Sequence, residues 1–578
     1  MMPKIKAANA MLNVLKDWKV DHLYGLPGGS FDSTMNALHE TSELNYIQVR
    51  HEETGALAAA ADAKLTGKIG VAFGSAGPGA THLFNGLYDA KMDHVPVLAL
   101  VGQVATSTMN TDGFQELNEN PMFNDVAVYN RTVTTAQQLP HVVDQAIKHA
   151  YQESSVAVVT IPTDLGWIEI EDSFTATAKN YRQGYPQAEV ADINAAVKLL
   201  TAAKRPTLYI GQGTRGATDE VVALADYYSM PIVSSVLAKG IIPDDHPAYM
   251  GTAGRVASKP GNEIVATADL ILFIGSDFPF AASTFNLQAK FIQIDIDSSK
   301  LGKRHHTDVA ILGDAKTTMR QLFEQGQPKE KNSFYQAALA NNKNWRNWLA
   351  SFATAKQIPL RVEPIFAEIN RIAQEDAIFA VDVGNVTIDG IRLLSLTPNQ
   401  KFTTSGWFAT MGYGLPAAIA AQLNYKKRQV FNIAGDGGFS MGMQDLITAV
   451  KYKLPIINVV LSNDSLGFIE AEQDDTPQPH SGIDLASADY ATFAKAMGAE
   501  GYSVHNLTDL RAAFDQAASA TGPIVIDVKI ANERPIPVEH LVIDPEAGHS
   551  QTDIDQFNQT YASKALVPFQ KYLTQYQA

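Results

Sequence analysis

Two apolar runs in the last third of the chain each end in oxygen-bearing side chains. The run 430–434 leads to Asp436, which stands among glycines, and the run 455–461 leads to Asn463. One carboxylate and one amide oxygen are too few for a metal cage, but they suit a Mg²⁺ ion that takes further ligands from water and a diphosphate. The pattern indicates a metal–phosphate site. A glycine turn and a strand-ending asparagine are the plain structural alternative.

The elements around these residues predict why they meet. The two runs are short and rich in β-branched residues, and apolar residues recur at helical spacing between Met441 and Val450. Strand, helix and strand form a βαβ unit, whose right-handed crossover leaves the strands parallel. Asp436 and Asn463 are therefore expected in one crevice, where open α/β sheets bind ligands. A helix starting near Ser440 would direct its amides toward an anion there.

The whole chain is predicted to have an α/β fold with three domains, each with a mainly parallel sheet flanked by helices. Strand-like runs alternate with helical stretches in three blocks, and polar, patternless segments near 173–190 and 326–332 separate them. We expect three domains and a C-terminal tail, at 1–175, 190–325, 340–532 and 533–578. The end of the tail, "ALVPFQKYLTQYQA", is expected to pack against the body rather than to anchor in a membrane, because Lys571 and the preceding Lys564 are its only cations.

Composition excludes several classes of protein. The 578 residues include 45 basic and 61 acidic side chains, a net charge of −16, which argues against nucleic acid or an anionic membrane as partner. No apolar run approaches the ~18 residues of a membrane-spanning helix, and the N-terminus lacks the apolar core of a signal peptide, so a cytoplasmic protein is expected. The absence of cysteine excludes disulfides, zinc–thiolate sites and thiol nucleophiles.

The second block carries a glycine motif. "LYIGQGTRGA" has the GxGxxG spacing between a strand and a helix, but the acidic residue expected about 20 positions later for a nicotinamide site is missing. Acidic residues do follow a later strand, where they could hold ribose hydroxyls, and an arginine in a loop could meet a diphosphate. A nucleotide site and a tight packing turn are equally open. The residues concerned are Gly211, Gly213, Gly216, Arg255, Asp295 and Asp297.

The first block contains an alanine-rich helix with two glutamates in its first turn, "RHEETGALAAAADAKLTG". Acidic residues at this position ordinarily match the helix dipole. Small residues after Glu52 allow another helix to pack closely, so this carboxylate could be buried and share a proton with a ligand. The loop "GSAGPGATH" is typical of a ligand-contacting turn and places His82 at the start of the next helix, where a purely structural histidine is the alternative.

Together these motifs resemble the thiamine diphosphate-dependent enzymes of the pyruvate oxidase and acetolactate synthase group. The likeness covers nearly the whole chain, and the blocks follow the order of that group's pyrimidine-binding, central FAD-binding and diphosphate-binding domains. Gly435-Asp436-Gly437 followed by Asn463 resembles the group's cofactor signature, and "QVRHEETGA" resembles the segment that carries its glutamate. Several runs are most similar to the flavin-dependent pyruvate oxidases of lactic acid bacteria, among them "HLYGLPGGS", "FQELNENPMF", "FATMGYGLPAAIAA" and "GFIEAEQDDT".

The resemblance implies a role for each matching residue. Asp436, Asn463 and the backbone carbonyl of Ser465 would hold Mg²⁺ on the diphosphate, although this chain has Asp464 where many members have a second asparagine. Glu52 would hydrogen-bond the aminopyrimidine, and Met411 would support the bent cofactor. Gly211, Gly213, Arg255, Asp295 and Asp297 would hold FAD. The positions that match the lining of the reaction cavity are His82, Phe114, Gln115, Val383, Phe468, Ile469 and Glu472.

The implied activity is that of a pyruvate oxidase. Such an enzyme converts pyruvate, phosphate and O2 to acetyl phosphate, CO2 and H2O2 through a hydroxyethyl-thiamine diphosphate enamine that FAD oxidises. Acetolactate synthase, which condenses two pyruvates and keeps FAD without redox use, is the nearest alternative. A non-oxidative decarboxylase and a catalytically silent nucleotide-binding protein are further alternatives. The resemblance also implies a homo-oligomer, at least a dimer and by expectation a tetramer, because the group's sites form between the first domain of one chain and the third of another.

Overall fold

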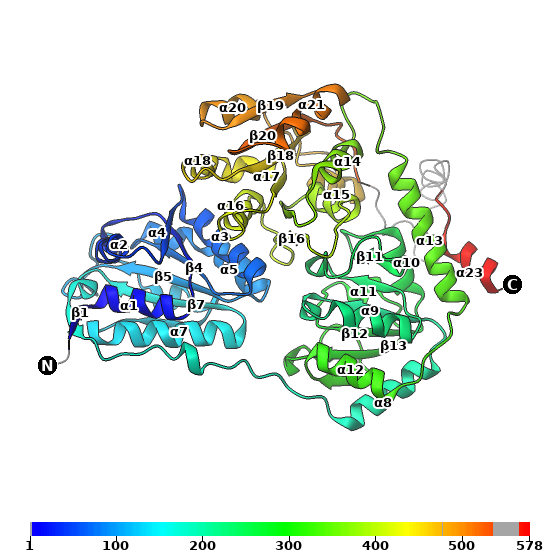
Figure 1. Cartoon of the computed structure of the whole chain (residues 1–578), viewed down its shortest axis with the longest axis horizontal. Helices are drawn as coiled ribbons and strands as arrows, with labels where there is room; N and C mark the ends of the chain where they lie inside the picture. The colour runs from blue at the N-terminus through cyan, green and yellow to red at the C-terminus, as the bar shows by residue number, and fades with distance from the viewer. Residues whose placement is uncertain (1–2, 477, 536–565, 578) are drawn as a thin grey trace.

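The computed structural model describes residues 3–476, 478–535 and 566–577. Three six-stranded sheets, each fully parallel, dominate this part of the chain, and helices cover both faces of each (Figure 1). The predicted α/β fold with three mainly parallel sheets is confirmed, while the domain limits themselves stay a prediction. The first and third sheets lie side by side, and a long irregular segment leads from the first to the central one (Figure 1).

The first sheet has the strand order β3-β2-β4-β5-β7-β6. Its central strands are buried along their whole length, because helices cover both faces of a parallel sheet and every side chain therefore faces the core. A short antiparallel pair, β1 (Lys4–Lys6) with β8 (Glu169–Glu171), flanks it. The strands and main helices are β2 (His22–Gly25), β3 (Asn45–Gln48), β4 (Gly70–Gly74), β5 (Val97–Gln103), β6 (Ala127–Thr132), β7 (Val156–Pro162), α1 (Ala7–Asp17), α2 (Asp32–His39), α3 (Glu52–Thr66), α4 (Pro78–His82), α5 (Phe84–Met92), α6 (Glu119–Met122) and α7 (Leu139–Glu153).

The central sheet has the strand order β11-β10-β9-β12-β13-β14. This is the doubly wound order of dinucleotide-binding folds, and its crevice lies where the order reverses, between β9 and β12. The glycine motif follows β9, so the sequence motif and the topology point to the same edge. The elements are β9 (Pro206–Ile210), β10 (Ile232–Ser234), β11 (Tyr249–Thr252), β12 (Leu270–Ile274), β13 (Lys290–Asp295), β14 (Val309–Leu312), α8 (Val190–Ala202), α9 (Thr218–Tyr227), α10 (Lys259–Thr267), α11 (Ala281–Thr284) and α12 (Ala315–Gln325).

The third sheet has the strand order β16-β15-β17-β18-β20-β19. The order reverses between β15 and β17, which places a crevice at the carboxyl ends of these strands. Residues 430–435 and 456–462 form β17 and β18, paired in parallel as predicted. The elements are β15 (Ile378–Val381), β16 (Lys401–Thr403), β17 (Val430–Gly435), β18 (Ile456–Ser462), β19 (Glu500–Val504), β20 (Ile524–Lys529), α14 (Val362–Ile372), α15 (Asn385–Leu393), α16 (Gly414–Asn424), α17 (Asp436–Gly442), α18 (Leu446–Lys451), α19 (Gly467–Asp475), α20 (Tyr490–Ala496) and α21 (Leu507–Ala517). Helix α13 (Ser333–Ala350), which precedes them in the chain, packs on α10 and β11 of the central domain.

Two local expectations differ from the structure. The helix expected near Ser440 begins at Asp436 itself, because the glycines that follow adopt helical backbone angles directly after the strand. His82, expected just inside the start of a helix, is the last residue of the short helix α4, since Pro78 already starts that helix four residues earlier.

The C-terminal helix α23 (Phe569–Gln577) packs against α13, as expected for the end of the chain. Phe569 and Leu573 are buried, and the Phe569 ring lies edge-on to Phe334 with centroids 5.9 Å apart. The rest of the predicted tail, 536–565, lies outside the described residues. Among the described helices, none is long and apolar enough to cross a membrane.

Candidate active site

Backbone amides hold the Asp436 carboxylate at the carboxyl ends of β17 and β18. Its Oδ2 accepts the N–H groups of Asn463 (3.1 Å) and Asp464 (2.7 Å), and its Oδ1 accepts that of Gly437 (2.9 Å). Burial raises the pKa of the Asp436 carboxyl, and the neighbouring Asp464 acts in the same direction. The carboxylate is therefore immobile and aimed by the main chain, as a metal ligand must be.

A chain of hydrogen bonds fixes the orientation of the Asn463 amide. The carboxylate of Glu470 can only accept, so the Nδ2 of Asn532 must donate to it (2.7 Å) and the Oδ1 of Asn532 must face Asn463. The Nδ2 of Asn463 donates to that oxygen over 2.9 Å. Glu470 is held in turn by the hydroxyl of Ser465 (2.8 Å). The Oδ1 of Asn463 consequently points toward Asp436.

Three oxygens converge as a result. The Oδ1 of Asn463 lies 3.0 Å from the backbone oxygen of Ser465 and 3.3 Å from the Oδ1 of Asp436. Oxygens this close repel one another unless a cation lies between them. Neighbouring ligands of an octahedral Mg²⁺ with bonds of 2.0–2.1 Å are about 2.9 Å apart, close to both separations. The three predicted metal ligands therefore fit Mg²⁺.

Asp382, at the end of β15, positions Met411. Its carboxylate accepts the N–H groups of Gly412 (2.9 Å) and Gly414 (3.0 Å), and burial raises its pKa to about 6. The loop held in this way brings the Met411 side chain against the backbone of Gly437, where a Cβ would lie 3.1 Å from the Met411 Cε. The next residue after Asp382 is Val383, so this predicted cofactor contact also lies at the crevice of the third sheet.

In the first domain, Glu52 is the first residue of α3 and is 6% exposed. Its Oε2 lies 2.9 Å from the Nδ1 of His82, and the His82 ring stacks on His51 with centroids 4.3 Å apart. The backbone of Gly79 approaches the carboxylate so closely that a Cβ there would lie 3.2 Å from Oε1. The structure thus brings Glu52 and His82 together and buries the glutamate, which dipole matching alone does not require.

The loop 104–118 carries Phe114 and Gln115 to the same edge of the first sheet. Gly77 has φ +70°, an angle that favours glycine, and a Cβ there would lie 3.0 Å from the Gln115 backbone oxygen. The side-chain amide of Gln103 anchors the loop by donating to the Leu117 carbonyl (2.7 Å) and to the Glu119 carboxylate. Burial raises the pKa of Glu119 to about 7. The Phe114 side chain is 89% exposed, an unusual position for an apolar ring unless a ligand or a partner covers it.

Arg255 of the central domain reaches the third domain. Its Nη1 lies 2.7 Å from the Oε1 of Glu472, and its guanidinium lies 5.0 Å from the centre of the Phe468 ring. Glu472, Phe468 and the partly exposed Ile469 all belong to α19, which follows the Ser465 carbonyl. An arginine predicted for the flavin diphosphate and three predicted cavity residues therefore lie together.

The glycine motif has a packing role in this chain. The N–H of Gly211 donates to the backbone oxygen of Ile274, and the N–H of Gly213 donates to that of Gly275. A Cβ at Gly211 would lie 2.1 Å from the Gly275 oxygen. These glycines can bring the backbone close to a nucleotide, but their own amides are already paired. Gly216 has φ +81° and open space around it.

Two acidic residues lie at the carboxyl end of β13. The Oδ1 of Asp295 accepts the N–H of Asp297 (2.9 Å), and burial raises the Asp295 pKa to about 6. Asp297 accepts the N–H of Ser299 and caps a short 3₁₀ helix. Each carboxylate accepts one backbone N–H, so each keeps hydrogen-bonding capacity for a ribose hydroxyl.

The site residues therefore form two groups in one chain. Glu52, His82 and Gln115 lie on the first sheet, and Asp436, Asn463, Ser465 and Met411 lie on the third. Within the described residues, no hydrogen bond or ion pair joins the two groups. Sequence reasoning missed Asp382 and Asn532. Asp382 follows an apolar strand, so the rule that singled out Asp436 could have found it. Asn532 contacts Asn463 only through the tertiary fold.

Comparison with known proteins identifies the class. Residues 5–122, 193–322 and 382–528 match the families described as thiamine pyrophosphate enzyme, N-terminal TPP binding domain, central domain and C-terminal TPP binding domain, respectively. The chain belongs to the thiamine pyrophosphate enzyme family, thiamine pyrophosphate being another name for thiamine diphosphate.

Individual relatives narrow the likeness. The pyruvate oxidase of Lactiplantibacillus plantarum is 49% identical over 99% of this chain and 96% of its own length. A thiamine pyrophosphate-containing protein of Bacillus subtilis, YdaP, is 42% identical over 92% of each chain. The acetolactate synthase of Arthrospira platensis is 29% identical over 95% of this chain and 98% of its own.

Proposed function

We propose that this protein is a pyruvate oxidase that uses thiamine diphosphate, Mg²⁺ and FAD to convert pyruvate, phosphate and O2 to acetyl phosphate, CO2 and H2O2. The observation that carries the proposal is the 49% identity to a pyruvate oxidase along nearly the whole chain, against 29% for an acetolactate synthase. When bound, thiamine diphosphate supplies the electron sink that decarboxylation of a 2-oxo acid needs, and FAD accepts two electrons.

The third domain is assigned the metal and the diphosphate. Asp436, Asn463 and the Ser465 carbonyl present three converging oxygens to Mg²⁺, and Asn532 keeps the Asn463 oxygen turned toward the ion. Met411 lies against Gly437, in the loop that the Asp382 carboxylate holds through the N–H groups of Gly412 and Gly414, and it would support the cofactor ring. The predicted contacts Gly435 and Gly437 leave room for the diphosphate because neither has a side chain.

The first domain is assigned the proton chemistry. Glu52 is buried, so its carboxyl can exchange a proton with the aminopyrimidine without competition from bulk water. His82 shares a hydrogen bond with Glu52 and is 42% exposed at its side chain, which suits a group that faces both the glutamate and the substrate. Gln115 and the exposed Phe114 lie on the adjacent loop, where they would contact substrate.

The central domain is assigned the flavin. Arg255 lies against Phe468 and Glu472, so a diphosphate bound by this arginine would lie close to the helix that carries the cavity residues Phe468, Ile469 and Glu472. Asp295 would accept a ribose hydroxyl. Gly211 and Gly213 would allow the backbone to approach the nucleotide at the topological switch point.

A homo-oligomer, at least a dimer and by preference a tetramer, completes the proposal. The Glu52 group and the Asp436 group lie on different domains of one chain without a direct bond between them, and Phe114 is nearly fully exposed. A second copy that brings its first domain to this third domain would complete the site and cover Phe114. We further infer that the enzyme acts in the cytoplasm.

Product analysis tests the proposal. The loaded protein is given pyruvate, phosphate and O2, and acetyl phosphate, H2O2 and acetolactate are measured together. Equal amounts of acetyl phosphate and peroxide are expected. Peroxide with free acetate would mean that water is the acceptor, whereas acetolactate without peroxide would overturn the oxidase in favour of a synthase.

A further inference from the structure

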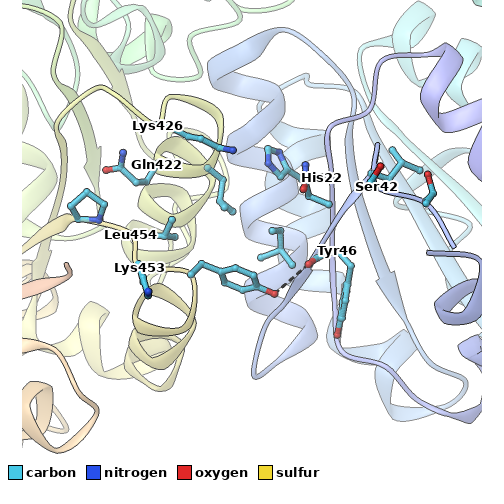
Figure 2. A pocket seen from close by; sticks show the side chains of 14 residues that line it. His22, Ser42, Tyr46, Gln422, Lys426, Lys453 and Leu454 are labelled. Carbon is cyan, nitrogen blue, oxygen red and sulfur yellow. Dashed lines mark hydrogen bonds between the residues drawn. The ribbon is translucent and has the colours of Figure 1, made fainter. Parts of the chain in front are cut away.

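A cavity of about 590 Å³ lies between the first and third domains, and none of the candidate active-site residues lines it. One wall comes from β2, β3 and the segment before β3, and the other from the end of α16 and the turn after α18 (Figure 2). The volume is within the range of about 300–1,000 Å³ that is typical of small-molecule sites, which often occur between domains.

The cavity is lined by cations without carboxylates. Lys426 and Lys453 belong to its wall, and the lining includes no aspartate or glutamate. Both residues are exposed, and within the described residues neither side-chain ammonium forms an ion pair or a hydrogen bond. In a chain with a net charge of −16, two unpaired lysines in a cavity free of acidic groups create a local positive potential. This potential favours an anion.

A buried polar side chain in the same wall lacks a partner. His22 lines the cavity and is 6% exposed, and within the described residues neither nitrogen of its ring forms a hydrogen bond. The closest carboxylate oxygen, on Asp62, is 3.8 Å away and already accepts the hydroxyl of Tyr24. Since buried polar groups are nearly always hydrogen-bonded in native proteins, this unpartnered imidazole in the cavity wall points to a bound molecule.

We propose that this cavity binds a small organic anion, a carboxylate or a phosphate ester. Figure 2 shows the Lys426 side chain, in the turn just after α16, extending toward the His22 ring across the gap between the domains, so the anionic group would lie between them. Lys453 supplies a second positive charge, and Leu44 and Leu454 offer apolar surface to the carbon skeleton. A ligand in this position contacts both domains at once and holds them in one relative placement.

The test measures binding of two probes, citrate and glucose 6-phosphate, to the cofactor-loaded enzyme by titration calorimetry without pyruvate. The double variant Lys426→Gln, Lys453→Gly removes both charges. Glycine suits position 453 because Lys453 has φ +52°, an angle that strains other residues. The control is Lys427→Gln, which removes one positive charge from an exposed neighbour that does not line the cavity.

At least one probe is expected to bind the wild type, with affinity at least tenfold lower in the double variant and within twofold in the control. Binding of citrate alone identifies a carboxylate ligand, and binding of glucose 6-phosphate alone identifies a phosphate ester. The proposal is wrong if neither probe binds, or if the control loses as much affinity as the double variant. Pyruvate turnover of the double variant without probe should equal that of the wild type, which separates this test from that of the proposed function.

Discussion

Replacing Lys64 with methionine is predicted to loosen the packing of the first domain on the third. Lys64 lies on α3 with its side chain 9% exposed, and its Nζ is 2.7 Å from both Asp89 and Asp93. It also donates to the Thr404 carbonyl (3.2 Å), and Asp93 accepts the N–H of Trp407 (2.9 Å). The ammonium therefore neutralises two buried carboxylates of the first domain at the place where the third domain contacts them.

The expected cost follows from this burial. Removing one partner of a buried ion pair costs about 3–5 kcal/mol, because the remaining charge is left without compensation. Burial already raises the pKa of Asp89 to about 6 with Lys64 present, and loss of the cation raises that pKa further. A carboxyl with a raised pKa takes up a proton as the pH falls, which removes the uncompensated charge. The destabilisation should therefore be full at pH 8 and smaller at pH 5.5.

Hydrogen exchange is the suitable assay, because a chain of three domains does not unfold in a single step. Each variant is compared with the wild type at the same pH. With a factor of ten per 1.4 kcal/mol, the amides of α3 should exchange at least about 100-fold faster in Lys64→Met at pH 8. Lys68→Met is the control, since Lys68 and Asp21 form an exposed pair at 2.6 Å that is worth about 0–1 kcal/mol. An effect no larger than the control's, or one that grows as the pH falls, would refute this reasoning.

Three further predictions concern the proposed site. Glu52→Gln should lower pyruvate turnover by about 10²–10⁴-fold with an unchanged circular dichroism spectrum and FAD content, and unchanged turnover would exclude proton transfer by Glu52. Asn532→Ala should weaken Mg²⁺ binding by about 10–100-fold in metal titrations, because the Asn463 amide is then free to turn; equal affinity would show that the amide is held otherwise. FAD affinity should fall as the pH drops through about 6, because Asp295 then takes up a proton and accepts a ribose hydroxyl less well. Asp295→Asn should abolish this pH dependence, and a pH dependence that persists in the variant would belong to another group.

The sequence predicts the fold well where a local pattern and a topological rule act together. Residues 430–435 and 456–462 are continuous apolar runs because both faces of the sheet are covered, and the right-handed crossover then brings Asp436 and Asn463 to one edge. The structure confirms the parallel pairing. The position of His82 was predicted less well, since a histidine five residues into "PGATH" could begin or end a helix, and only the contact with Glu52 distinguishes the two.

Contacts between distant segments lie beyond sequence reasoning. Asn532 orients Asn463 although 69 residues separate them, and Lys64 meets Thr404 at a separation of 340 residues. The amides of Gly211 and Gly213 are paired with the end of β12, which no spacing rule within the motif predicts. These features arise when packed elements bring side chains or backbones together, and they are visible only in three dimensions.

Anaerobic reduction of the flavin tests the central claim most directly. The enzyme is loaded with thiamine diphosphate, Mg²⁺ and FAD, pyruvate is added without oxygen, and the visible absorbance of the oxidised flavin is followed together with CO2 release. A pyruvate oxidase should lose this absorbance promptly on addition of pyruvate and regain it when air is admitted. Release of CO2 while the flavin stays oxidised would contradict the account.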